Sequence, residues 1–158
     1  MSRLQREVKK RQPFASPEQE AMLSIVRTND RFQIQFTRLF RQYRLTSSQY
    51  NVLRILRGEG RPLPILEIAQ RMLTVVPGIT GLVDRLEQSG WVQRARCEND
   101  RRVVYVAPTD KALRVLAKMD EPVMDLHRSL MGHMSKRELA DLIRLLEKAR
   151  SGLDAVEA

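Results

Sequence analysis

Four arginines gather in one short segment of the chain, at Arg94, Arg96, Arg101 and Arg102. A guanidinium group stays charged and donates hydrogen bonds in a fixed fork, which suits the phosphates of a nucleic-acid backbone. The segment, WVQRARCENDRRVVYV over 91–106, is rich in β-forming residues, and Asn99 and Asp100 in its middle favour a turn. We therefore expect a β-hairpin whose arginines approach a duplex, with Arg101 entering the minor groove.

Asp100 is expected to brace this hairpin, because it can cap the turn and pair with Arg102. The residues predicted to contact DNA from the hairpin are Arg94, Arg96, Asn99, Arg101 and Arg102. The alternative is a polar hairpin that is only solvated.

The segment before the hairpin combines helical apolar spacing with residues that weaken a helix. Glycine and proline cost about 1 and 3 kcal/mol in a helix interior relative to alanine, yet the stretch 72–90 contains both. On a helix lying in the major groove, small residues let the DNA backbone approach closely, while Thr80 and Arg85 can bond a base edge or a phosphate. The residues predicted to contact DNA from this helix are Pro77, Gly78, Thr80, Gly81 and Arg85.

Two further expectations concern this helix. Its apolar residues share one face and should pack in a core with the two preceding helices; they are Ile79, Leu82, Val83 and Leu86. Asp84 is expected to orient Arg85 or an arginine of the hairpin. The alternative for the two glycines is close packing against another protein helix.

Capping signals and apolar spacing predict the elements that position these residues. The pattern serine or threonine followed three residues later by glutamine or glutamate occurs at Ser16, Thr46 and Ser135, so helices should begin there. Thr109 can cap a further helix that should begin near Lys111 and have a kink at Pro122. The predicted helices span 17–44, 47–57, 65–73, 75–88, 111–134 and 136–156, with the hairpin at 91–106.

Three short helices followed by a β-hairpin make a winged helix. The predicted fold is mainly α with a small β-hairpin wing, a winged helix-turn-helix flanked by N- and C-terminal dimerisation helices. The long apolar stripes of the outer helices need a partner beyond the winged helix, and a second subunit would supply it. The predicted parts are a basic, flexible arm (1–15), a dimerisation helix (16–44), the winged helix-turn-helix (45–108) and C-terminal dimerisation helices (109–158).

Composition narrows the class of protein. The 158 residues carry a formal charge of +9, which favours a polyanionic partner, although an anionic membrane surface would attract the same charge. No apolar run is long enough for a membrane span and the N-terminus lacks a signal-peptide pattern, so we expect a cytoplasmic protein that does not associate with membranes. One cysteine, Cys97, excludes an internal disulfide and a cysteine-rich zinc motif.

No pattern indicates catalysis. The sequence lacks a nucleotide-binding loop, a nucleophile next to a base and paired carboxylates, so we predict no enzyme, no catalytic residue and no cofactor. His127 and His133 are spaced so that they scatter around a helix, and we predict no metal site. The functional alternatives are a winged helix that binds protein or RNA, and a redox-sensing repressor that uses Cys97.

Four blocks resemble consecutive blocks of the MarR family of bacterial transcriptional regulators: LTSSQYNVLRIL, LEIAQRM, ITGLVDRLEQSGWVQR and DRRVVYVAPTDKA. The resemblance covers about residues 45–115 without a gap. Departures from the family pattern occur at Val75, Pro108 and Ala112, where the family usually has a polar cap, leucine and glycine.

The resemblance implies a sequence-specific DNA-binding regulator, a homodimer on a pseudo-palindromic operator, and repression released by a small amphipathic or aromatic effector. Phe36, Phe40 and Tyr43 could line the effector pocket, although apolar residues at helical spacing also suit a packed core.

Overall fold

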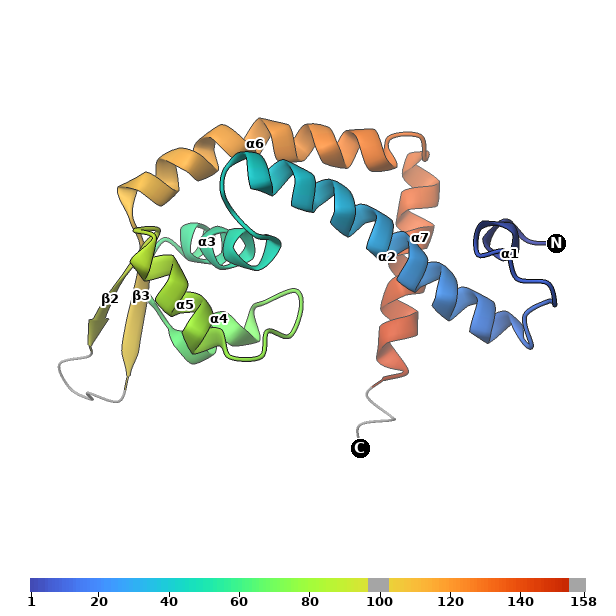
Figure 1. Cartoon of the computed structure of the whole chain (residues 1–158), viewed down its shortest axis with the longest axis horizontal. Helices are drawn as coiled ribbons and strands as arrows, with labels where there is room; N and C mark the ends of the chain where they lie inside the picture. Colours follow the sequence, from blue (N-terminus) through green and yellow to red (C-terminus); the bar gives the residue numbers. More distant parts are fainter. Residues whose placement is uncertain (97–102, 154–158) are drawn as a thin grey trace. The chain divides into compact units, whose positions relative to one another are not determined.

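The computed structural model describes residues 1–96 and 103–153, and the chain divides within one helix into two units, Met1–Pro122 and Val123–Ala158 (Figure 1). In chain order the elements are α1 (Arg3–Glu7), α2 (Pro17–Gln42), α3 (Ser47–Glu59), β1 (Leu63–Pro64), α4 (Ile65–Gln70), α5 (Ile79–Gln88), β2 (Val92–Arg96), β3 (Val104–Pro108), α6 (Asp110–Met131) and α7 (Lys136–Ser151). This order confirms the predicted winged helix with flanking helices.

Side-chain caps begin several helices where the sequence predicts them. Ser16 accepts a hydrogen bond from the Gln19 amide at the start of α2, and Thr46 and Gln49 form a reciprocal capping box at α3. The same reciprocal pair joins Ser135 and Glu138 at α7. Each box satisfies amide groups that have no partner within their own helix, so these starts depend on local sequence alone.

The core of the winged helix forms where the predicted apolar faces meet. Leu82, Val83 and Leu86 of α5 are buried, and the fully buried side chains around them come from α3, α4 and the sheet. They include Val52, Leu53, Leu56, Leu63, Ile68 and Val106. Leu116 and Met119 of α6 are also fully buried, so the first half of α6 belongs to the core of the same unit.

The wing is part of a three-stranded antiparallel sheet in the order β1-β3-β2, where the sequence predicts a two-stranded hairpin. In β2 and β3, Arg94 lies opposite Val106 and Ala95 lies opposite Tyr105. The added strand β1 pairs Leu63 with Val106. Because directly opposed residues point to the same face, Arg94 shares the face of the buried Val106.

The predicted basic, flexible arm contains the short helix α1. Leu4 of α1 is buried, and Glu7, the one acidic residue among the first fifteen, lies 3.7 Å from Arg27 and 3.5 Å from Arg31 of α2. These contacts place α1 against α2 in the first unit.

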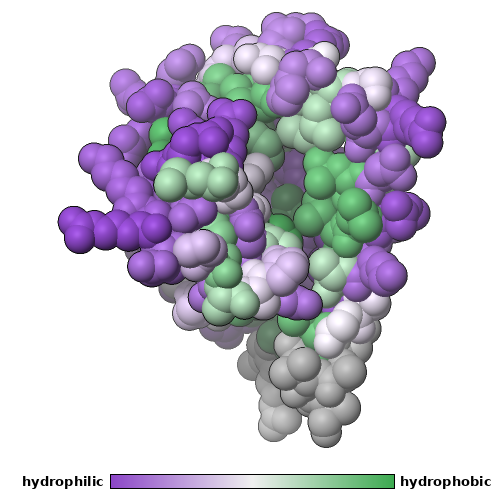
Figure 2. All heavy atoms as spheres, turned by 90° about the vertical axis from the view of Figure 1, so that its right-hand side faces the viewer, coloured by the Kyte–Doolittle hydropathy of each residue, from purple (hydrophilic) through white to green (hydrophobic). Residues whose placement is uncertain are grey.

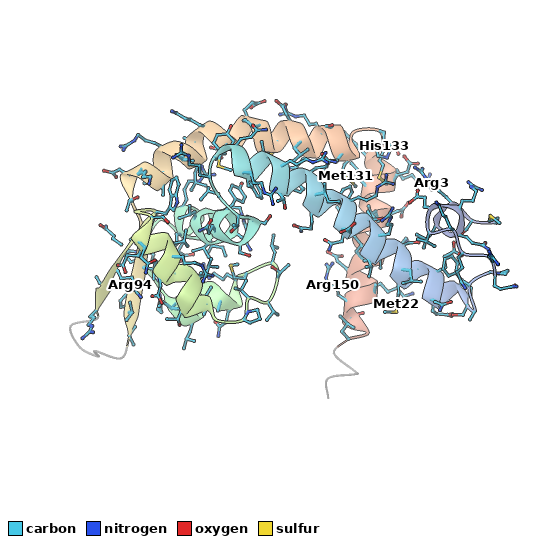
Figure 3. The ribbon with its side chains drawn as sticks, viewed as in Figure 1. Arg3, Met22, Arg94, Met131, His133 and Arg150 are labelled. Atoms are coloured by element: carbon cyan, nitrogen blue, oxygen red, sulfur yellow. The ribbon has the colours of Figure 1, made fainter. Side chains whose placement is uncertain are left out.

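Apolar side chains remain exposed on the outer helices, as the green atoms among the purple ones in Figure 2 illustrate. Met22 and Val26 of α2 are 68% and 61% exposed, and Met22 is labelled in Figure 3. In the second unit, none of the described residues Lys136–Ser151 is buried, and Ile143 is 58% exposed. Each unit therefore has apolar surface that its own residues leave exposed to solvent.

Candidate nucleic-acid interface

The two helices of the helix-turn-helix are α4 and α5, which the loop 71–78 connects. The sequence predicts that the second helix begins near Val75, and this prediction is wrong by four residues, because α5 begins at Ile79. Gly78 has φ of +70° and ψ of +48°, a left-handed conformation that interrupts helical geometry and that glycine adopts without a side-chain clash. Gly78 is the N-cap of α5, and no side chain caps the helix.

The two sides of α5 differ as the apolar spacing predicts. Leu82, Val83 and Leu86 are inside the core and Ile79 is half-buried, while Thr80 and Arg85 are exposed. Pro77 and Gly78 are also exposed, at the N-terminal end of the helix. The predicted DNA-contacting residues of this segment therefore lie on the surface of the molecule.

The two glycines border open space instead of another helix. A Cβ atom at Gly78 would meet no heavy atom within 4 Å, and one at Gly81 would meet only Nη1 of Arg85, at 3.8 Å. Within the described chain, Gly78 and Gly81 therefore do not serve close packing against a neighbouring helix. The Arg85 guanidinium instead lies beside the bare backbone of Gly81, one helical turn away.

Arg94 of β2 joins the wing to α5 (Figure 3). Its Nη1 donates to Oδ1 of Asp84 at 2.7 Å, its Nε donates to Oε2 of Glu87 at 2.8 Å, and its Nη2 also donates to Glu87. The sequence predicts that Asp84 orients Arg85 or a hairpin arginine, and the contact with Arg94 confirms the second of these. Sequence reasoning missed Glu87, although it lies three residues from Asp84 and so on the same side of α5.

The charges of this cluster stabilise one another. The hydrogen bond from Arg94 lowers the pKa of the Glu87 carboxyl below its ordinary value. The same hydrogen bond raises the pKa of the Arg94 guanidinium. Both shifts favour the charged forms of the Arg94–Glu87 pair.

The tip of the wing lies outside the described residues. Asn99, Asp100, Arg101, Arg102 and Cys97 all fall in 97–102, so their predicted roles stay predictions. Arg96, the last residue of β2, is exposed.

Hydrogen bonds at the base of the wing connect α5, β2 and α6. The Trp91 amide donates to the Leu86 carbonyl at 2.8 Å, and Gly90 takes the left-handed conformation in the turn. The Thr109 hydroxyl donates to the Gly90 carbonyl at 2.9 Å and accepts from the Ala112 amide at 3.3 Å, which confirms Thr109 as a cap.

Lys111 adds to this junction from the first turn of α6. Its Nζ donates to the Ser89 carbonyl at 2.8 Å and lies 4.2 Å from the centre of the Trp91 ring. The end of α5 and the start of α6 are thus connected directly.

Three exposed apolar residues near α5 have no counterpart in the sequence prediction. Leu66 of α4 is 75% exposed, and Leu73 and Val75 of the connecting loop are 81% and 95% exposed. Apolar spacing alone could not identify them, because it predicts which residues face a core. It also placed Leu73 in a helix that ends at Gln70 in the structure, and Val75 in a helix that begins at Ile79.

The predicted effector residues lie around an aromatic stack. Phe40 is buried, its ring centre lies 5.8 Å from that of Phe36, and it stacks on Tyr50 at 4.3 Å with an interplanar angle of 19°. Tyr43 is half-buried at the end of α2. Sequence reasoning did not include Tyr50, whose pKa is raised by burial.

A hollow of about 640 Å³ lies at the wing sheet, away from these aromatic residues. It is lined by Arg61, Pro62, Gln93, Arg94, Ala95, Tyr105 and Ala107. Tyr105 and Ala95 lie opposite one another in β3 and β2, on the face that does not carry Val106.

The described residues 1–96 and 103–153 also bear on two other kinds of site. No three histidine, cysteine, aspartate or glutamate side chains among them lie together as metal ligands would. None of the helices that the structure describes combines the length and the apolar composition needed to traverse a lipid bilayer.

A helix-turn-helix whose second helix is fixed beside a β-ribbon defines the winged-helix class of DNA-binding proteins. The model of the MarR family matches residues 45–104, from the residue before the Thr46 cap to the start of β3. The crystal structure of a MarR transcription factor from Planctomyces limnophilus is 43% identical, covers 85% of this chain and 98% of that chain, and has a TM-score of 0.66. The chain belongs to the MarR family and is a MarR-type transcriptional regulator.

Two further relatives describe what members of this family do. The structure of a mutant MarR from E. coli complexed with operator DNA is 26% identical, covers 79% of this chain and 89% of that chain, and has a TM-score of 0.72. The homoprotocatechuate degradative operon repressor of Escherichia coli is 25% identical over 113 residues, which are 72% of this chain and 76% of the relative.

Proposed function

We propose that the protein is a homodimeric repressor that binds a pseudo-palindromic operator in double-stranded DNA and is released by a small amphipathic or aromatic molecule. The observation that carries this function is the surface formed by α5 and β2. Gly81, Thr80 and Arg85 of α5 and its N-cap Gly78 lie on this surface, and Arg94 holds β2 beside the helix. The MarR structure with operator DNA and the relative named as a repressor support the same function.

In this proposal α5 is the recognition helix in the major groove. Thr80 and Arg85 contact base edges or phosphates, and the open space at Gly78 and Gly81 lets the DNA backbone come close, next to the exposed Pro77. From the wing we propose Arg96, Asn99, Arg101 and Arg102 as DNA contacts and Asp100 as the residue that braces the wing. Arg94 is set apart from these residues by its hydrogen bonds to Asp84 and Glu87.

The proposed dimer would cover the exposed apolar surface of the outer helices. Met22 and Val26 of α2, and Ile143 of α7, are each more than half exposed within the chain. Apolar area removed from water stabilises an assembly by about 25 cal/mol per Å² before the costs of association are subtracted. Twofold symmetry would place the two copies of α5 about 34 Å apart, one turn of B-form DNA.

The proposed effector would bind near Phe36, Phe40 and Tyr43. Phe36 and Tyr43 are partly exposed, and Phe36 lies beside the buried Phe40; aromatic side chains of this kind suit an aromatic molecule. A cytoplasmic location follows from the proposed DNA partner, and the proposal includes no cofactor, metal or catalytic step.

Selection of bound fragments from the genome of the source organism, followed by gel-shift titration, is the direct experiment. We expect one duplex to bind more tightly than a scrambled duplex of equal length, and Arg85→Ala to weaken that binding by about 1–3 kcal/mol if the guanidinium contacts a base. Light scattering should give twice the chain mass of 18.3 kDa.

Equal affinity for all duplexes, or tighter binding to RNA, would contradict the proposed binding to a specific operator and favour a winged helix that binds protein or RNA. A mass of one chain at the concentrations used for binding would reject the dimer.

A further inference from the structure

We propose that Arg94 is a positioning residue, which fixes the wing against the recognition helix through Asp84 and Glu87 and does not itself contact DNA; this role rests on the proposed DNA-binding function. The sequence alone counts Arg94 among the arginines of the wing that would meet DNA. Its contacts in the structure indicate a different use.

The strand places Arg94 on the side of the sheet that faces the protein. It lies opposite Val106, which is fully buried, and shares its face with Val92, which is 2% exposed. The neighbouring residues Gln93 and Ala95 alternate to the other face. The Arg94 side chain is 29% exposed.

The hydrogen-bonding capacity of Arg94 is largely used within the protein. All three nitrogen atoms of the guanidinium donate to carboxylates, Nε and Nη2 to Glu87 and Nη1 to Asp84. Three of the five N–H groups of the guanidinium are thereby used, and the fork formed by Nε and Nη2 is occupied by Glu87, so a phosphate could take that fork only if the bonds to Glu87 broke. Breaking them would leave the unpaired negative charge of Glu87 on the helix that approaches the DNA backbone.

The position of the cluster along β2 explains what it fixes. The wing is attached to the rest of the unit at its base, where the Trp91 amide bonds to Leu86 and the Lys111 ammonium lies over the Trp91 ring. Arg94 lies three residues further along the strand, roughly 10 Å at the rise of an extended chain. The pairing of β3 with β1 already holds the sheet to the core at this level, and Arg94 adds a direct attachment of β2 to α5, which fixes the wing relative to this helix.

A positioning role and a phosphate contact differ in how binding depends on salt. Each phosphate contact by a cation contributes about 0.9 to the slope of log K against log salt concentration, because binding releases counterions. Loss of a contacting arginine should therefore reduce the slope by about one per subunit, whereas loss of a positioning arginine should lower affinity at an unchanged slope.

The experiment compares Arg94→Gln with the matched change Arg85→Gln in the full-length protein, on the duplex that binds most tightly. We expect Arg94→Gln to weaken binding on the order of tenfold with the wild-type slope, and Arg85→Gln to weaken binding with a smaller slope. Arg94→Lys keeps the charge but not the fork, so it should recover only part of the loss.

Amide hydrogen exchange without DNA measures the attachment itself. Exchange in 92–96 and 104–108 should be faster in Arg94→Gln and in the double variant Asp84→Asn/Glu87→Gln, and unchanged in Arg85→Gln. Adding Arg94→Gln to the double variant should accelerate exchange little further, because the attachment is already lost.

A reduced salt slope in Arg94→Gln, together with unchanged exchange in both strands, would overturn the positioning role and make Arg94 a phosphate contact. If the wild type does not discriminate between duplexes, the proposed function fails, and the exchange of Arg94→Gln still decides whether the residue fixes the wing.

Discussion

Gly81→Ala should separate the stability of the fold from its affinity for DNA. The new Cβ atom would meet only Arg85 Nη1 at 3.8 Å, an ordinary van der Waals distance, so the substitution introduces no clash within the described chain. Alanine is favoured over glycine in a helix interior by up to about 1 kcal/mol, and Gly81 is the third residue of α5. The free energy of unfolding should therefore rise by as much as about 1 kcal/mol, which raises the melting temperature by roughly 2–4 °C in a chain of this size.

The same methyl group should weaken DNA binding. If the recognition helix presents its bare backbone to the duplex, the methyl group occupies the space of closest approach, and we expect affinity for the selected operator to fall on the order of tenfold, or about 1.4 kcal/mol. Thermal unfolding followed by circular dichroism and gel-shift titration measure the two effects on the same preparation.

Gly78→Ala is the contrasting variant. It also meets no atom within 4 Å, but its φ of +70° costs a residue with a side chain roughly 1–2 kcal/mol, so this variant should be less stable than the wild type. A lower melting temperature for Gly81→Ala would show that another part of the molecule packs on Gly81. Wild-type affinity in that variant would refute the close approach of DNA.

Other perturbations address the scaffold around the interface. A hydrogen bond from Arg71 lowers the pKa of the Glu59 carboxyl below its ordinary 4.5. The ionised carboxyl therefore stabilises the fold above about pH 4.5, and this stabilisation is lost as the pH falls further. In unfolding experiments at decreasing pH, the difference in unfolding free energy between wild type and Glu59→Gln should shrink below about pH 4.5. The Arg57 guanidinium donates two hydrogen bonds, of 3.0 and 2.7 Å, to the exposed Asp120 carboxylate, and a double-mutant cycle with alanine at both positions should give a coupling of about 0.5–1 kcal/mol in urea unfolding; zero coupling would contradict the forked pair. Leu116 is fully buried, so Leu116→Ala should cost about 2–5 kcal/mol by the same assay, and a cost below 1 kcal/mol would mean that α6 does not share the core of the winged helix.

Features that depend on neighbouring residues in the sequence were predictable. The capping boxes at Thr46 and Ser135 bind amides three residues away, and the buried face of α5 follows from the spacing of Leu82, Val83 and Leu86. Such features need no knowledge of the tertiary structure, because the partners lie within one helical turn.

Features that depend on contacts between separate elements could not be predicted from the sequence. Strand β1 has two residues and exists because Leu63 pairs with Val106, more than forty residues later in the chain. The start of α5 lies later in the chain than predicted because Gly78 has a left-handed conformation, which glycine permits but does not require.

The role of Arg94 shows the same limit within the interface. Counting arginines identified the cationic hairpin, but only the register of β2 against β3 shows that Arg94 is directed toward the protein. Its partner Glu87 was assigned no role, because the distance between a helix side chain and a strand side chain cannot be read from their separation in sequence.

The junction of Thr109 and Lys111 with the turn at Gly90 has a mechanical consequence. Thr109 directly precedes α6 and Lys111 lies in its first turn. Their side chains donate hydrogen bonds to the carbonyl groups of Gly90 and Ser89, which follow the last residue of α5. Because these hydrogen bonds join the start of α6 directly to the residues that end α5, a displacement of the first turn of α6 would displace the end of α5 with it.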